Sequence, residues 1–169
     1  MSSDCDQNTM MAHAAPSEGH HRLNPFVGKW NARVKFFMAP GEPPSESTGT
    51  MENEWILGGR YLEQRYRSEM MGQPFEGRGL MGFCNGRQCY EGNWADTWGT
   101  GMMISRGSVD PSGRVFTMLG EVFSPGAGGP IPCRAVATIH DQNRNSYDMY
   151  FPGPDGRELH MMSIEYTRA

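Results

Sequence analysis

The sequence has no long apolar run, no basic stripe and few cysteines, and each absence removes a class of protein. A helix that crosses a membrane needs about 20 consecutive apolar residues, and no run approaches that length. Nucleic-acid binding through phosphates requires a concentration of Lys and Arg on one surface. Here 15 basic and 19 acidic residues are mixed along the chain, with a net charge of −4. We therefore expect no membrane span and no nucleic-acid partner.

The cysteines are too few and too scattered to form a disulfide scaffold, since only four occur in 169 residues. Cys84 and Cys89 flank the turn at residues 85–88, which would place them opposite each other in a hairpin. A bridge between them is left open. No second Cys or His pair stands nearby with zinc-ligand spacing, so no metal and no cofactor are expected. The first residues lack the pattern of a secretory signal, and the expected location is the cytoplasm.

Helical periodicity is also missing after Phe26, and strand patterns take its place. From Trp30 to Met38 apolar and polar residues alternate strictly, as in a half-buried strand. Turn signals then recur about every ten residues, which is typical of antiparallel hairpins. The last strand pattern, residues 158–166, reaches almost to the end of the sequence, where it can pair with the first strand. We expect an all-β fold: a closed antiparallel up-and-down barrel of about ten strands.

The chain length fits one domain with a core of its own. Residues 1–19 are small and polar, so we expect a disordered N-terminal leader. Residues 20–169 would form the barrel domain, entered by a short helical segment near residues 20–26.

Glycines and methionines suggest an interior with room for a ligand. Gly77, Gly79 and Gly92 alternate with larger residues on faces that we expect to point inward. Because glycine has no side chain, it would leave part of the interior empty, as ligand-holding barrels do. The sequence also contains 14 methionines, whose flexible thioethers adapt to varied guests.

The candidate ligand-binding residues are mostly aromatic side chains expected on the inner face. They are Trp30, Phe36, Trp55, Tyr66, Phe75, Trp94, Met103 and Arg134. Arg134 alternates with Val136 and Thr138, and a buried arginine needs an anionic partner such as Asp96, Glu121 or a ligand carboxylate. The predicted partner is therefore a small apolar or amphipathic molecule that carries one polar or anionic group.

Three alternatives remain open in the sequence. The first is an enzyme on the same barrel, with Asp96 or Glu76 as the base of a proton-transfer or cyclisation reaction. If neither carboxylate has a catalytic role, Asp96 would cap a hairpin turn and Glu76 would lie on the outer surface. The second is haem binding, which needs an imidazole inside the barrel, and His160 is the only histidine in the middle of a strand pattern. The third is a packed domain that serves assembly, for example as a homodimer.

Several motifs together resemble one bacterial family. Gly28-Lys29-Trp30 is similar to the GxW signature of lipocalin-type barrels. More specific are the stretches NEWILGGRYL at residues 53–62, EMMGQPFEG at 69–77, WAD at 94–96, TGMM at 100–103, YFPGPDG at 150–156 and YTR at 166–168. From His20 to Arg168 the chain resembles the bacterial domain of unknown function 1579 (DUF1579). That family is similar to the calycin barrels, which include lipocalins, fatty-acid-binding proteins and nitrobindin-type haem proteins.

The resemblance implies a barrel fold and no particular reaction. The chain departs from the family pattern at Arg134, which is followed by Ala135 where a glutamate is usual. If arginine and glutamate form an interior pair in relatives, this departure implies a different charge inside the barrel and a different ligand.

Overall fold

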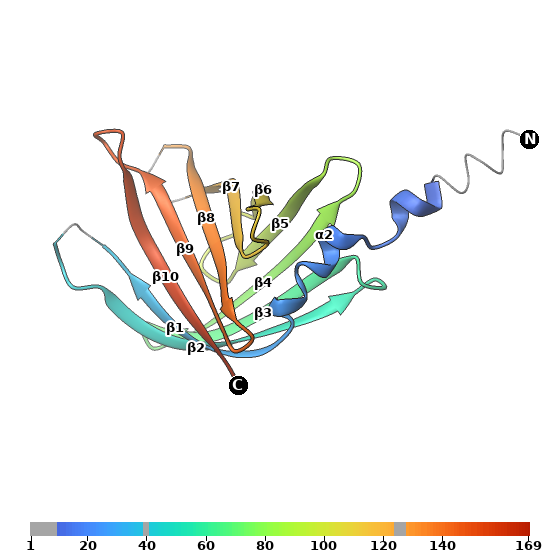
Figure 1. The fold of residues 1–169 in the computed structure, drawn as a ribbon. Helices are drawn as coiled ribbons and strands as arrows, with labels where there is room; N and C mark the ends of the chain where they lie inside the picture. The colour runs from blue at the N-terminus through green and yellow to red at the C-terminus, as the bar shows by residue number, and fades with distance from the viewer. Residues whose placement is uncertain (1–9, 39–40, 124–127) are drawn as a thin grey trace, which may run out of the picture.

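Ten antiparallel strands form a closed barrel in the computed structural model, which describes residues 10–38, 41–123 and 128–169 (Figure 1). Each strand pairs with its neighbours in sequence, and the last strand pairs with the first. The strands are β1 (Gly28–Phe36), β2 (Ser45–Ile56), β3 (Tyr61–Met70), β4 (Gln73–Cys84), β5 (Cys89–Asp96), β6 (Met103–Val109), β7 (Val115–Phe123), β8 (Pro130–Asp141), β9 (Arg144–Pro152) and β10 (Glu158–Arg168). The predicted up-and-down barrel is confirmed.

Strand β1 shows how alternation defines the inside. Trp30, Ala32 and Val34 are buried, while the residues between them face outward. Ala32 lies opposite Gly49 of β2 on one side and Tyr166 of β10 on the other. Because side chains of a strand alternate between its faces, this register sets the inner face of all three strands.

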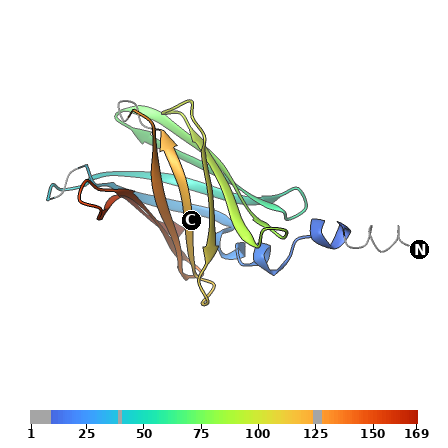
Figure 2. The ribbon, with the colours of Figure 1, turned by 90° about the horizontal axis from the view of Figure 1, so that it is seen from above.

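A short N-terminal segment closes one end of the barrel. Helix α2 (Glu18–His21) and the 3₁₀ turn η1 (Asn24–Phe26) lie beside the turns at that end (Figure 2). Leu23 and Phe26 are inserted into a buried cluster with Leu62, Tyr90 and Phe116. Full burial of such side chains stabilises the fold by about 1.5–3 kcal/mol each, so this end is a packed plug.

Polar groups fix the plug in place. The indole nitrogen of Trp30 and the side-chain amide of Asn53 both donate hydrogen bonds to the carbonyl of Phe26, at 2.9 and 2.8 Å. The hydroxyl of Tyr90 donates to the carbonyl of Gly19 at 3.0 Å. Each bond satisfies a backbone carbonyl that the short helical segments leave without a partner.

The GxW motif has a geometric reason at this end. The guanidinium of Arg168 lies 4.2 Å from the ring centroid of Trp30 and donates to the carbonyls of Val27 and Gln142. Gly28 has a φ of +120°, and a Cβ there would lie 2.6 Å from Arg168 Nη1. Only glycine combines this backbone conformation with room for the guanidinium.

The segment before Gly19 contacts the barrel, although the sequence favours a disordered leader there. The side-chain amide of Asn85, in the β4–β5 turn, donates to the carbonyls of His13 and Ala15 at 2.9 Å. The Ser17 hydroxyl donates to the Asn85 side-chain oxygen at 2.6 Å. Because Asn85 is far from this segment in the sequence, no local sequence pattern indicates the contact. The first nine residues of the predicted leader lie outside the described residues.

The cysteines of the β4–β5 hairpin are opposite each other, as predicted. Cys84 pairs with Cys89 across the two strands, and both thiols are free. The turn between them ends at Gln88, which has a φ of 51° and donates its backbone N–H to the carbonyl of Cys84.

Candidate ligand-binding site

The inner wall keeps solvent-accessible surface in the half of the barrel away from the plug. Several inward positions on β5, β6, β9 and β10 are only partly buried. They are Trp94, Met103, Tyr147, Met149 and Met162. Trp55, Met81 and Phe83 beside the plug are partly buried as well, and an interior fully packed by side chains would bury all such positions.

Contacts across the barrel confirm the inward direction of these side chains. Trp94 and Met162 pack against the cluster that contains Trp30 and Tyr66. Tyr147 packs against both this cluster and the one beside the plug, so it lies where the two meet. Tyr147 is itself only partly buried, so the inner wall keeps some accessible surface where the two clusters meet.

The inner-face glycines have a different role from the predicted one. The indole of Trp94 lies across Gly77 and Gly79, and a Cβ at Gly79 would be 2.9 Å from Trp94 Cε3. The expectation that these two glycines leave empty space is therefore wrong. They allow a large ring to lie flat against the sheet. At Gly92, by contrast, the nearest atoms to a Cβ would be 3.3 Å or more away.

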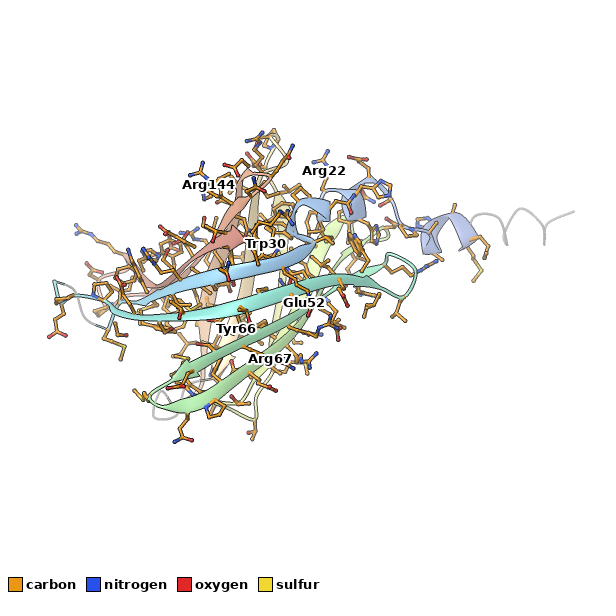
Figure 3. All side chains as sticks on the ribbon, turned by 90° about the horizontal axis from the view of Figure 1, so that it is seen from below. Arg22, Trp30, Glu52, Tyr66, Arg67 and Arg144 are labelled. Carbon is orange, nitrogen blue, oxygen red and sulfur yellow. The ribbon has the colours of Figure 1, made fainter. Side chains whose placement is uncertain are left out.

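A second flat ring covers Gly49. A Cβ at Gly49 would lie 2.6 Å from Cζ of Tyr66, whose ring leans from β3 toward β1. Figure 3 shows these strands from below, with Tyr66 labelled. Tyr66 packs edge-on against Phe75, which in turn packs edge-on against Trp98 of the β5–β6 loop. An aromatic row thus runs from the interior to the open end.

Asp96 holds the Trp94 indole and the next turn in place. One carboxylate oxygen accepts a hydrogen bond from Trp94 Nε1 at 3.0 Å. The other accepts from the backbone N–H of Trp98 at 2.9 Å. The structure therefore shows the turn-capping contact that the sequence offered as an alternative to an interior base.

Arg134 lies on the outside of the barrel, so the prediction that it faces the interior is wrong. Its neighbours Cys133 and Ala135 are buried, as is Ile139 further along the same face of β8. The guanidinium makes two hydrogen bonds of 2.7 and 2.6 Å to Glu158 and lies 4.2 Å from the ring centroid of Tyr150. Strand β8 carries small or apolar residues on both faces, so its alternation did not reveal which face is buried.

Glu76 also lies outside and forms an ion pair with Arg67 at 3.5 Å. Its side chain keeps 54% of its surface exposed. The enzyme alternative placed Glu76 in the interior as a base, and the structure does not bring it there. An exposed ion pair of this kind contributes less than about 1 kcal/mol to stability.

His160 faces outward because of a β-bulge. The pairing of β10 with β9 shifts between His160 and Met162, so the two side chains leave opposite faces of the sheet. The imidazole stacks between Phe37 and Tyr150, with ring centroids 4.7 Å away on each side, and its Nε2 lies 2.8 Å from Asp148. The haem alternative required this imidazole inside the barrel, and the structure places it on the outer face.

The remaining predicted ligand-binding residues face inward at different depths. Trp30 and Trp55 lie toward the plug, where Trp55 Nε1 donates to the Asn24 side chain at 2.9 Å. Phe36 and Met103 lie toward the open end, and Met103 Sδ is 3.9 Å from the Cys133 thiol. Facing inward is a condition for contact with a ligand, and these residues meet it.

Two tyrosines that were not among the predicted site residues, Tyr147 and Tyr166, also face inward. Burial raises the pKa of the Tyr147 hydroxyl far above its ordinary value, and the nearby Cys133 raises it further. Burial also raises the pKa of Tyr166, followed by the proximity of Tyr66 and Tyr147. The signal that was available is the alternation of Tyr147 with Met149 on β9 and of Tyr166 with Ile164 on β10.

Charge is confined to the two ends of this interior. Asp96 lies near the open end and Arg168 at the closed end, and between them the described strands carry no charged side chain on their inner faces. Within the described part of the chain, no group of three His, Cys, Asp or Glu side chains is placed to hold a metal ion.

The geometry can be compared with known proteins. A family model described as "Protein of unknown function (DUF1579)" matches residues 15–168. The chain belongs to the DUF1579 family. No curated protein matches this DUF1579 chain. None of its described helices is long and apolar enough to cross a membrane.

Two solved structures share the fold of this DUF1579 chain. The crystal structure of Rv2717c from M. tuberculosis is 18% identical with a TM-score of 0.68, over 92% of this chain and 99% of that one. The S-type phycobiliprotein lyase CPES from Guillardia theta is 7% identical with a TM-score of 0.59, over 91% and 98%. At these identities the likeness shows the barrel fold alone.

Proposed function

We propose that this DUF1579 protein binds a small, largely apolar molecule in the half of the barrel away from the plug. The observation that carries the proposal is the partly buried inner wall formed by residues such as Trp94, Met103 and Met149. Apolar side chains that face inward and still contact solvent are what a binding site for an apolar molecule presents before the ligand arrives. Displacing water from such surface favours binding by about 25 cal/mol for each Å².

The two ends of the barrel support this proposal. Leu23 and Phe26 pack the closed end, so a ligand would enter from the other end. There the wall carries Met103, Met149 and Met162, whose flexible side chains adjust to guests of different shape.

The alternatives draw less support from the geometry. Asp96 already accepts hydrogen bonds from Trp94 and Trp98, and Glu76 lies outside, so no interior carboxylate is free in the described strands to serve as a base. Arg134 is paired with Glu158 on the outer face and is not an orienting group for a ligand inside. One structural neighbour is named a phycobiliprotein lyase, and the shared fold carries no reaction from it to this chain.

Fluorescence titration with N-phenyl-1-naphthylamine tests the proposal, since this neutral apolar dye brightens in an apolar site. We expect saturable binding of one dye per chain. Met103→Trp would fill part of the interior and weaken the affinity at least tenfold. Ile104→Trp is the matched control, because Ile104 is the next residue on β6, faces outward and is 57% exposed.

The two variants decide the location of binding. The proposal holds if Ile104→Trp stays within twofold of the wild type while Met103→Trp loses affinity. Equal effects of both variants, or the absence of saturable binding, would contradict it. Urea unfolding of both variants checks that each remains folded.

A further inference from the structure

The interior contains hydroxyl groups that the packing of the protein does not use. Tyr147 packs against both buried clusters, and Tyr166 is 8% exposed. Neither hydroxyl forms a hydrogen bond with another described residue, whereas Tyr90, beside the plug, donates to the carbonyl of Gly19. A hydroxyl sealed from water without a partner would cost roughly 1–3 kcal/mol, so these two phenols need contact with water or with a ligand.

The two hydroxyls are within reach of solvent in the interior. Among the described residues, the fully enclosed side-chain atoms that lack a partner are Ser47 Oγ and Asn53 Oδ1. The phenol oxygens of Tyr147 and Tyr166 are not in that group, so each retains accessible surface. Such groups can donate a hydrogen bond to water in the free protein and to a ligand in a complex.

Small residues bring a third tyrosine toward this pair. The ring of Tyr66 crosses Gly49, and the residue opposite Gly49 is Ala32, which itself lies opposite Tyr166. Two positions with little or no side chain therefore separate Tyr66 from Tyr166 along the inner wall. The pKa of Tyr166 responds to both Tyr66 and Tyr147, as expected for phenols that share one region.

The surrounding wall decides which ligand chemistry fits. Around the phenols lie mostly apolar side chains, with the amide of Asn145 opposite Tyr166. The inner faces of the described strands carry no charged group between Asp96 and Arg168. A ligand carboxylate at this depth would lose its hydration without gaining a cationic partner, which costs far more than hydrogen bonds from neutral donors return. A neutral oxygen loses much less.

We propose that the hydroxyls of Tyr147 and Tyr166, with Tyr66 beside them, form the polar recognition site of the barrel and select a ligand with an uncharged acceptor oxygen on an apolar body. Ketone, quinone, ester and ether oxygens belong to this class, and carboxylates do not. The inference rests on the proposed function and revises the anionic group that the sequence suggested, because the arginine assigned to that group lies outside.

Three isosteric compounds test the inference by displacement of N-phenyl-1-naphthylamine. The ketone 2-acetylnaphthalene presents a neutral acceptor oxygen, and the hydrocarbon 2-isopropylnaphthalene presents no acceptor. The third compound, 2-naphthoate, presents an anion. In the wild type, we expect 2-naphthoate to bind at least tenfold more weakly than the ketone. The double variant Tyr147→Phe/Tyr166→Phe should weaken ketone binding about tenfold, the equivalent of one or two hydrogen bonds. It should change the affinity for the hydrocarbon less than twofold.

Tyr61→Phe is the control, since Tyr61 faces outward and is 42% exposed. It should leave all three affinities unchanged. The inference is overturned, with the proposed function intact, if the double variant weakens the ketone and the hydrocarbon equally or if 2-naphthoate binds most tightly. If neither the dye nor any of the three compounds binds, the proposed function fails and the inference fails with it. Because Phe keeps the ring and the lost hydroxyls have no hydrogen-bond partner among the described residues, the double variant should unfold at an unchanged or higher urea concentration.

Discussion

The substitution Gly77→Ala probes the packing that shapes the inner wall. A methyl group on Gly77 would lie 2.7 Å from Trp94 Cη2 and 2.9 Å from Trp94 Cε2. Trp94 Cζ2 would lie closer still, and ordinary carbon contacts are about 3.5–4.0 Å, so the indole would have to move by more than about 1 Å toward the interior. That movement strains the 3.0 Å hydrogen bond from Trp94 Nε1 to Asp96.

The expected cost follows from these contacts. Overpacking of a core by one methyl group typically costs about 1–3 kcal/mol. With a urea dependence of about 2 kcal/mol per M, the midpoint of urea unfolding should fall by roughly 0.5–1.5 M. Gly86→Ala is the matched control, because a Cβ there meets no atom within 4 Å, and it should change stability by less than about 0.5 kcal/mol.

A double-mutant cycle assigns the loss to the indole. Trp94→Ala removes the ring, so Gly77→Ala should cost little in that background, with a coupling energy of about 1–3 kcal/mol. Displacement of the indole should also weaken binding of N-phenyl-1-naphthylamine to the single variant. Close packing of the indole on Gly77 is refuted if Gly77→Ala is as stable as the wild type, or if Gly77→Ala destabilises the Trp94→Ala protein by the same amount.

Three further perturbations have defined outcomes. Tyr90→Phe removes the hydrogen bond to Gly19 and should lower the unfolding free energy by about 1 kcal/mol, seen in calorimetry as a fall in Tm of about 2–4 °C, and no change would contradict the role of this bond. Burial, His21 and Arg60 lower the pKa of His20 below its ordinary 6.5, so the unfolded chain binds more protons below pH 6.5, and stability should fall on acidification through that range. His20→Asn, whose side-chain oxygen can still accept from the Ser17 N–H, should lose less stability between pH 7 and 5.5, and parallel pH profiles of the two proteins would refute this. Arg134→Ala should leave dye affinity within twofold, whereas a tenfold loss would show that the outer guanidinium contributes to binding.

The fold could be predicted from the sequence because polar and apolar residues separate cleanly on most strands. On β3 and β4, Tyr66 and Phe75 alternate with Arg67 and Glu76, and charged side chains rarely turn inward without a partner. The pairing of the last strand with the first was likewise predictable, since a long sheet without a helical layer must protect its edges.

The interior could be predicted less well, for three physical reasons. On β8, Cys133 and Ala135 are no more apolar than Val136 on the opposite face. The predicted inner face was therefore off by one residue, which put Arg134 inside the barrel. On β10, a bulge inverted the direction of His160, and bulges have no reliable local signal. The glycines were recognised as inner-face positions, but the ring that lies over Gly77 comes from a neighbouring strand, and only the three-dimensional structure shows it.

The most direct test of the binding site is a titration of the protein, labelled with ¹³C at the methionine methyl groups, with N-phenyl-1-naphthylamine, followed by NMR. Met103, Met149 and Met162 line the proposed site, while Met11 and Met71 are 72% and 94% exposed on the outside. Binding inside the barrel predicts saturable shifts of the three inward methyl signals, caused by the ring current of the dye, with the Met11 and Met71 signals unchanged. Saturable shifts confined to the outer methionines, or no saturable shift of the inward ones, would contradict binding inside the barrel.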